Sequence, residues 1–179
     1  MPPGHPLQRL ASPSRTFSFV IHTVGISSFL ASFRYLQQFP QGPVAGSYGG
    51  HYQYLTIIGL GLALLAFIFG ALADLTLIPI FFDLKNIVSV CAAPLAVLVS
   101  TLYWSIVLID INLLFPPELQ LPFLVDFGFH AAPAVLLTLD LLLFSPPWAI
   151  KAQGAMAISL VLAFAYWGWI EWCFNHNGL

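Results

Sequence analysis

Residues 54–75, YLTIIGLGLALLAFIFGALADL, decide the fold class of this chain. Asp74 is the single charged residue in this stretch. One helix needs about 20 apolar residues to cross the roughly 30 Å hydrocarbon core of a bilayer, and this run is long enough. Its polarity does not alternate between successive residues, as a strand of a transmembrane β-barrel requires. The stretch therefore predicts a membrane-spanning α-helix.

The whole chain shares this apolar character. It is 59% hydrophobic and only 7% charged, whereas soluble domains contain about 25% charged residues. A surface so poor in charge excludes a soluble globular protein. The 5 Lys and Arg residues are spread along the chain, so no basic patch for nucleic acid is expected. We predict an all-α, polytopic transmembrane helical bundle, a single integral membrane domain over residues 1–179 with a short N-terminal tail at 1–15.

Apolar runs, separated by polar, Gly-rich or Pro-rich segments, predict the number of spans. The breaks are read as loops because Gly and Pro interrupt regular structure. The first run is the most polar and is expected to depend on its neighbours. The five predicted spans are 16–36, 54–75, 87–110, 128–145 and 155–174.

Basic residues set the predicted orientation, because Lys and Arg in short loops favour the cytoplasmic side. Arg9, Arg15, Lys85 and Lys151 fall on one side of five alternating spans, and Arg34 falls on the other. The N-terminus is therefore predicted to be cytoplasmic. The linkers after the first and third spans, and the C-terminus, then face the lumen or the outside. We expect a multi-pass protein of the endoplasmic reticulum or another endomembrane.

Thr56 and His130 each open a span on the non-cytoplasmic side. At 1.5 Å per residue, both lie within about one turn of the same interface, at similar depth. The two side chains can meet if the second and fourth spans are neighbours. Small residues let another helix approach closely, which turns Thr56 into the bundle. The small residues that share its helix face are Gly59, Ala63, Ala66 and Gly70.

Each of these two residues also has an ordinary explanation. A Thr in a membrane helix often bonds a carbonyl one turn back, and a His near the interface can serve as an anchor. Ionisable groups inside membranes are costly, however, and commonly mark functional sites. In the fourth span His130 shares a face with Ala134 and Thr138, and Asp126 precedes it by one turn if the helix extends that far.

Two motifs resemble the androgen-induced gene family of membrane proteins, which includes the androgen-dependent regulator of tissue factor pathway inhibitor. The motifs are Gly-Gly-His-Tyr-Gln-Tyr-Leu-Thr at 49–56 and Asp-Phe-Gly-Phe-His at 126–130. The resemblance implies a threonine hydrolase of fatty acid esters of hydroxy fatty acids. Thr56 matches the family's Thr after an aromatic-Leu pair, and His130 matches the last His of its Asn-His-Gly-x-His stretch.

The chain departs from the family pattern at several positions. Tyr52 and Gln53 stand where vertebrate members have Trp and Lys, and Asp126 and Phe127 replace the Asn and the first His. These changes leave Thr56 and His130 in place and bear on substrate preference. The family is also expected to have a sixth helix, so a shortened C-terminus is one explanation for the fifth span being last.

The resemblance implies a mechanism without cofactor or metal. Thr56 is expected to form an acyl-enzyme, because a hydroxyl needs a base to become a nucleophile and His130 can take its proton. The lipid ester substrate is expected to enter laterally from the bilayer. An oxyanion hole is required, and the Gly49-Gly50 backbone is a candidate. The acids expected to orient the His are Asp126, by its spacing, and alternatively Asp110 or Glu171.

One alternative is a metal-dependent membrane enzyme. Its ligands would be His51, His130, Cys173 and His176, which all lie near the outer face and are residue types that metals favour. No compact His-x-x-x-His or Cys-x-x-Cys spacing supports this alternative.

The other alternative is a non-enzymatic scaffold, receptor or transporter. Asp74, Asp110 and Asp140 lie in or near spans, where acids can mark a proton or ion path. Asp74 and Asp140 can equally be solvated at cytoplasmic helix ends. No internal inverted repeat indicates a transporter.

Overall fold

The computed structural model describes residues 15–38, 43–114, 117–145 and 150–178, which form helices and loops without a strand. The predicted 1–15 tail therefore lies, except for Arg15, outside the described residues. The α-helices are α1 (Arg15–Gln38), α2 (Leu55–Thr76), α3 (Pro79–Asp110), α4 (Phe123–His130), α5 (Ala132–Leu139) and α6 (Ala152–Asn177). The short turns are η1 (Pro43–Gly46), η2 (Gly50–Gln53), η3 (Ile111–Leu113), η4 (Pro117–Leu119) and the π-helical η5 (Asp140–Phe144).

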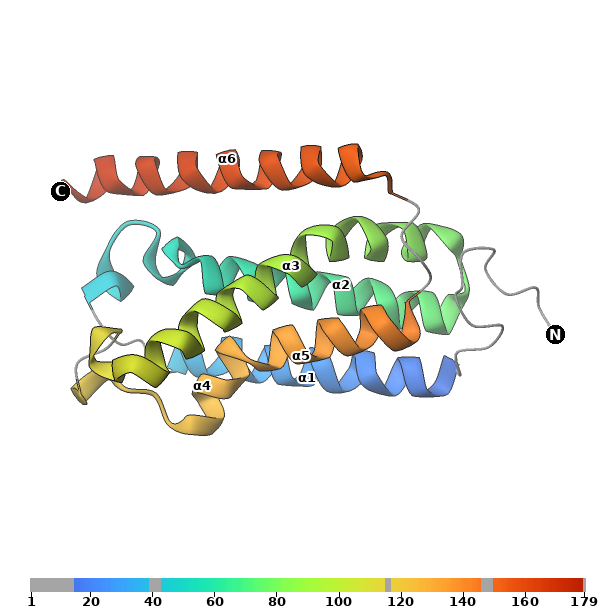
Figure 1. Cartoon of the computed structure of the whole chain (residues 1–179), viewed down its shortest axis with the longest axis horizontal. Coiled ribbons are helices and arrows are strands. Elements are labelled where there is room, and N and C mark those ends of the chain that lie inside the picture. Colours follow the sequence, from blue (N-terminus) through green and yellow to red (C-terminus); the bar gives the residue numbers. More distant parts are fainter. Residues whose placement is uncertain (1–14, 39–42, 115–116, 146–149, 179) are drawn as a thin grey trace.

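The all-α membrane bundle predicted from composition is confirmed. In the described ranges, α1, α2, α6 and the helix formed by α3 with η3 are each long and apolar enough to cross a membrane. The bent combination of α4 with α5 and η5 makes a fifth span if it is counted as one. Figure 1 shows α1, α2, α3 and the α4–α5 segment running along one another, with α6 beside them.

The fourth span is broken next to the candidate His. Helix α4 ends at His130 and α5 begins at Ala132, with a bend of 47° between the two axes. Pro133 lies in the first turn of α5, and a proline ring would clash with the carbonyl four residues earlier in an unbroken helix. The predicted span 128–145 therefore began too late. His130 lies at the break of the span and not at its head, and Asp126 is helical.

Helix α3 begins at Pro79, well before the predicted start at residue 87. It contains Lys85, which is 3% exposed and whose Nζ donates to Asp140 at 2.8 Å. The sequence placed Lys85 in a cytoplasmic loop, because a lysine without a partner is costly in a membrane helix. The tertiary ion pair removes that restriction, so Lys85 no longer supports the predicted orientation as a loop residue.

The stripe of small residues on α2 is buried, as predicted from its spacing. Gly59 lies against Leu95 of α3, and Gly70 lies so close to His22 of α1 that a Cβ would overlap the imidazole. The small residues let α1 and α3 approach α2 from two sides, as is common in membrane bundles. This packing places the N-terminal turn of α2, with Thr56, next to α3 and α4.

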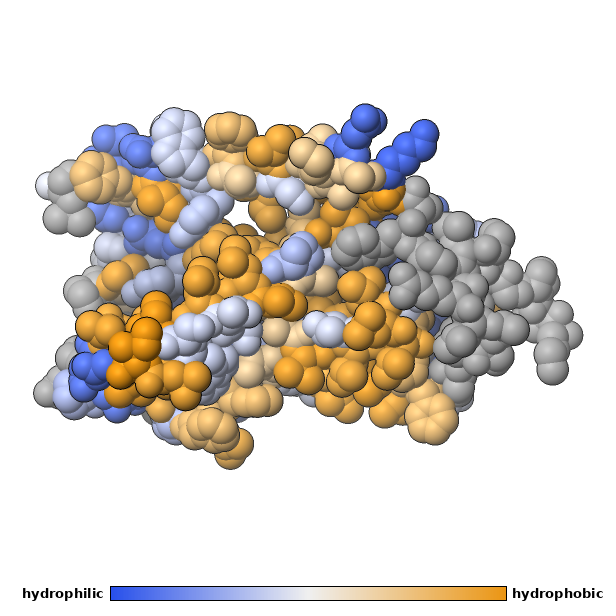
Figure 2. Space-filling view, in the orientation of Figure 1, coloured by the Kyte–Doolittle hydropathy of each residue, from blue (hydrophilic) through white to orange (hydrophobic). Residues whose placement is uncertain are grey.

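Helix α6 lies along one side of the bundle (Figure 1), where it contacts α3 and the segment before α2. Cys173 is its buried residue, and a Cβ at Gly49 would overlap the Cys173 sulfur. Tyr166 and Trp169 attach α6 to the segment before α2 by donating to the carbonyls of Gln53 and Tyr52 at 3.0 Å each. Figure 2 shows hydrophobic side chains across the middle of this face, with hydrophilic ones toward the ends of α6. A bilayer would cover that apolar band.

Candidate active site

His130 is held by an acid on its own helix. Its Nδ1 lies 2.7 Å from Oδ1 of Asp126, one turn earlier on α4, and 3.2 Å from the Asp126 carbonyl oxygen. His130 and Asp126 are 9% and 6% exposed. Because carboxylate and carbonyl oxygens only accept, Nδ1 carries the proton and Nε2 of a neutral ring is left with a lone pair. The predicted Asp126–His130 neighbours therefore meet in the geometry of a base and its orienting acid.

Tyr103 of α3 completes this arrangement. Its hydroxyl donates to the same Asp126 Oδ1 at 2.5 Å, and its ring stacks on the His130 imidazole with centroids 3.5 Å apart and planes 3° apart. Tyr103 is buried. No motif marked this residue in the sequence. The sequence offered one indication. Tyr103 lies about two turns before the end of the third predicted span, at a depth in the membrane similar to that predicted for His130.

Thr56 lies in the first turn of α2 and is half-buried. No hydrogen bond from its hydroxyl to another residue is found among the described contacts. The buried Ser89 hydroxyl of α3 likewise has no hydrogen-bond partner in the described structure, whereas several other hydroxyls on the spans bond the carbonyl four residues earlier. Those back-bonded residues are Thr23, Ser27, Ser32, Thr76 and Ser105.

Thr56 and His130 line one small cavity between α2, α3 and the α4–α5 break. Its volume is about 10 Å³, close to the smallest space that holds one water molecule. No direct hydrogen bond joins Thr56 Oγ1 to His130 in the described structure. The other lining residues are apolar or small: Gly59, Leu60, Ala96, Val99, Phe129 and Pro133.

The Gly49-Gly50 backbone does not serve the role considered for it in the sequence. Both glycines have positive φ, 85° and 47°. The Gly50 N–H donates to the Ser47 carbonyl at 3.0 Å, and neither glycine lines the cavity that Thr56 and His130 share. The glycines instead make a tight turn that lies against α6. In the first turn of α2 the Ile57 and Ile58 amides already donate to the Tyr54 carbonyl, so the Thr56 amide is the better-placed donor for an oxyanion.

The potential metal ligands named from the sequence do not form a site in the described ranges. No group of three His, Cys, Asp or Glu side chains there is arranged to hold a metal ion. His176 stacks on Tyr48, with ring centroids 4.4 Å apart. Cys173 lies against the Gly49 turn, and His130 is bonded to Asp126.

The other acids singled out in the sequence fall into two groups. Asp110 is exposed and accepts from the Asn112 amide at 2.9 Å, and Glu171 is exposed on α6, so neither orients His130. Asp74 and Asp140 are buried, 8% and 2% exposed, at the other end of the bundle. The alternative that these two acids are solvated at helix ends is therefore wrong.

Comparison with known proteins gives two matches. The family described as FAR-17a/AIG1-like protein matches residues 17–179. A Schizosaccharomyces pombe protein named a UPF0641 membrane protein is 34% identical over 168 residues, which cover 93% of this chain and 75% of that protein. No solved structure matches.

Proposed function

We propose that this chain, which belongs to the FAR-17a/AIG1-like protein family, is an intramembrane hydrolase of lipid esters that uses Thr56 as nucleophile and His130 as base. The substrates that the family resemblance favours are fatty acid esters of hydroxy fatty acids. The observation that carries the proposal is one cavity lined by both Thr56 and an acid-oriented His130. A multi-pass location in an endomembrane, with the N-terminus in the cytoplasm, belongs to the same proposal.

The reaction begins with proton transfer from Thr56 to His130. The Nδ1–H of His130 is committed to Asp126, so Nε2 is the acceptor. As the Thr56 oxygen bonds the ester carbonyl carbon, its proton moves to Nε2. The carbonyl electron pair moves to oxygen, and the tetrahedral intermediate forms.

Collapse of this intermediate breaks the ester C–O bond. His130 returns the proton to the leaving alkoxide, which departs as the hydroxy fatty acid, and the acyl group remains on Thr56. Water then gives a proton to Nε2 and attacks the acyl carbon. The Thr56 oxygen leaves and recovers that proton, so the enzyme is unchanged and the ester has consumed one water. The Thr56 amide, in the first turn of α2, is the expected donor to the negative oxygen.

Asp126 and Tyr103 fix the direction in which the base acts. An acid on Nδ1 selects the tautomer with a bare Nε2 and stabilises the imidazolium that forms during the reaction. Tyr103 restrains both partners, because its ring covers the imidazole face and its hydroxyl holds the carboxylate. We expect Tyr103 to be a positioning residue, since it acts through His130 and Asp126.

The surroundings suit an apolar substrate. Leu60, Val99, Phe129 and Pro133 complete the cavity wall, and the face of the bundle seen in Figure 2 is largely apolar over its middle part. A cavity of about 10 Å³ is too small for an acyl chain. The cavity therefore has to widen when a lipid enters from the bilayer.

The test is activity of the purified protein in lipid nanodiscs together with labelling by a fluorophosphonate probe. Thr56→Ala and His130→Ala are each expected to abolish both signals. The matched controls are Thr101→Ala, an exposed hydroxyl on α3, and His176→Ala, an exposed imidazole on α6; both should retain wild-type hydrolysis. Labelling that persists in Thr56→Ala would contradict the nucleophile assignment. Substrate flux in proteoliposomes without hydrolysis would favour a transporter.

A further inference from the structure

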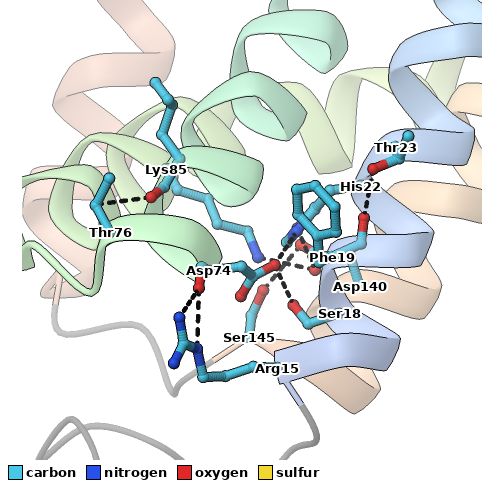
Figure 3. A network of polar contacts seen from close by, with 11 residues as sticks. Arg15, Ser18, Phe19, His22, Thr23, Asp74, Thr76, Lys85, Asp140 and Ser145 are labelled. Carbon is cyan, nitrogen blue, oxygen red and sulfur yellow. Dashed lines mark hydrogen bonds and ion pairs between the residues drawn. The ribbon is translucent and has the colours of Figure 1, made fainter.

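A second buried polar cluster lies at the end of the bundle opposite to His130. His22 of α1 is placed between Asp74 of α2 and Asp140 of η5, and Lys85 of α3 approaches Asp140 (Figure 3). All four residues are buried, and His22 is 1% exposed. Burying charged groups inside a membrane bundle is costly, and such groups usually have a function. The function of this cluster of four therefore needs an explanation.

The hydrogen bonds of His22 indicate its protonation. Nδ1 lies 2.7 Å from Asp74 Oδ2, and Nε2 lies 3.1 Å from Asp140 Oδ1. A carboxylate oxygen can only accept, so each contact needs a proton between nitrogen and oxygen. A neutral imidazole carries one N–H and would turn a bare lone pair toward the second carboxylate. Both contacts are hydrogen bonds only when two protons are present, one between His22 and Asp74 and one between His22 and Asp140.

Charge balance leads to the same proton count. Two carboxylates and the Lys85 ammonium together carry one negative charge, and one further proton on His22 makes the four groups neutral. The other polar neighbours do not change this sum, because Ser18 and Ser145 donate hydroxyls to Asp74 and Asp140 at 2.9 Å each. An unpaired buried charge is strongly destabilising, so the neutral state is favoured.

Arg15 is the remaining charged group facing the cluster. It is exposed at the start of α1, where water screens its charge. Its guanidinium donates to the main-chain carbonyls of Asp74 and Leu75 in the last turn of α2. No ion pair of Arg15 with a carboxylate is found among the described residues. The four buried groups therefore have to balance themselves.

A route for the proton is also present. A cavity of about 20 Å³, lined by Arg15, Ser18, His22, Asp74 and Lys85 among others, exceeds the space that one water molecule needs. Asp140 begins a π-helical turn in which the Ser145 amide donates to the Asp140 carbonyl at 2.8 Å. Such turns are frequent at functional sites.

We propose that His22, Asp74, Lys85 and Asp140 form a proton-binding site that takes up one exchangeable proton from the N-terminal face of the membrane. The bound proton neutralises the cluster and holds α1, α2, α3 and η5 together. Its release leaves one negative charge at their contact, so the folded state weakens as pH rises through the titration of the site. This sign follows because the folded chain binds more protons than the unfolded chain. The proposal does not depend on the hydrolase activity.

The test counts protons released when the full chain is unfolded by SDS in weakly buffered micelles, with an indicator dye as readout. At about pH 8.5 an unfolded His is neutral, so wild type is expected to release about one proton from this site on unfolding. His176→Gln, which removes an exposed imidazole on α6, should match wild type.

Asp74→Asn provides the sharper variant. One carboxylate balances Lys85 without any extra proton, so this protein should release about one proton fewer than wild type, and its thermal midpoint should vary less with pH. Nitrogen NMR of ¹⁵N-histidine wild type should also give an imidazolium signal at about pH 8.5. Equal proton release from wild type and Asp74→Asn, or wild type with only neutral imidazoles, would overturn the proposal.

Discussion

Asp126 Oδ1 accepts two hydrogen bonds, one from His130 on the same helix and one from Tyr103 on α3. The three side chains form one buried unit, in which the ring of Tyr103 also covers the imidazole. Residues that share a hydrogen-bond network do not contribute independently, so their substitutions should not add. Two residue-level predictions use this coupling.

Tyr103→Phe keeps the ring stack and removes the hydroxyl from Asp126. We expect kcat for ester hydrolysis to fall about tenfold, the effect of roughly 1.4 kcal/mol, with little change in KM because the hydroxyl does not contact the substrate. The thermal midpoint should stay within a few degrees of wild type. Tyr166→Phe is the control, since it removes a Tyr hydroxyl that bonds Gln53 instead. A rise in KM of about tenfold would instead show that the Tyr103 hydroxyl binds substrate.

Asp126→Asn tests the choice of imidazole tautomer. An amide can donate toward Nδ1 and favour the tautomer whose Nε2 is protonated and inactive as a base, so kcat should fall by at least about a hundredfold. Fluorophosphonate labelling of Thr56 should slow in parallel. The double variant with Tyr103→Phe should be no slower than Asp126→Asn alone, because the hydroxyl acts through the carboxylate. If the losses in kcat of the two single variants add in the double variant, Tyr103 does not act through Asp126.

Among the elements, α1 and α2 approach each other through glycine. A Cβ at Gly25 of α1 would overlap the ring of Phe67 on α2, which is fully buried. Gly25→Ala should therefore lower the free energy of unfolding by about 1–3 kcal/mol, the usual cost of overpacking, as measured by SDS titration. Gly61→Ala on α2 is the control. Its Cβ would meet nothing within 4 Å, so unchanged or slightly raised stability is expected.

At the scale of the whole molecule, the two polar clusters occupy opposite ends of one bundle. The Asp126–His130–Tyr103 unit lies at the end where α2 begins, and the His22 site lies where α2 ends. With the predicted orientation, the ester-cleaving end faces the lumen or the outside and the proton site faces the cytoplasm. This assignment of sides can be tested by measuring which loops of the protein face the cytoplasm.

Cysteine labelling in sealed endoplasmic reticulum vesicles measures that topology. With Cys91 and Cys173 replaced by Ala, Lys151→Cys should react at once with a membrane-impermeant maleimide, because residue 151 is predicted cytoplasmic. Ser47→Cys, before α2, should react only after the vesicles are permeabilised. Because Cys91 and Cys173 are the two cysteines of the chain, the parent protein that lacks both should give no labelling. Immediate labelling of Ser47→Cys, with Lys151→Cys protected until the vesicles are permeabilised, would show the opposite orientation.

Much of the fold and part of the site follow from local patterns. The apolar run around α2 and its small-residue stripe predicted a packed spanning helix, and the i,i+4 spacing placed Asp126 beside His130. The start of α3 was missed because Lys85 looked like a loop residue until its partner Asp140 was known. Tyr103 was missed because no sequence rule links it to residues on another helix.

The sequence by itself determined that the chain crosses a membrane as helices, since apolar length and low charge are properties of the chain alone. It also determined which residues share a helix face. The tertiary structure decided what depends on contacts between helices: the shared cavity of Thr56 and His130, the Tyr103 stack, and the burial of His22 with three charged partners. Burial of a charge is tolerated only when its partners arrive from other segments, and no single segment contains that information.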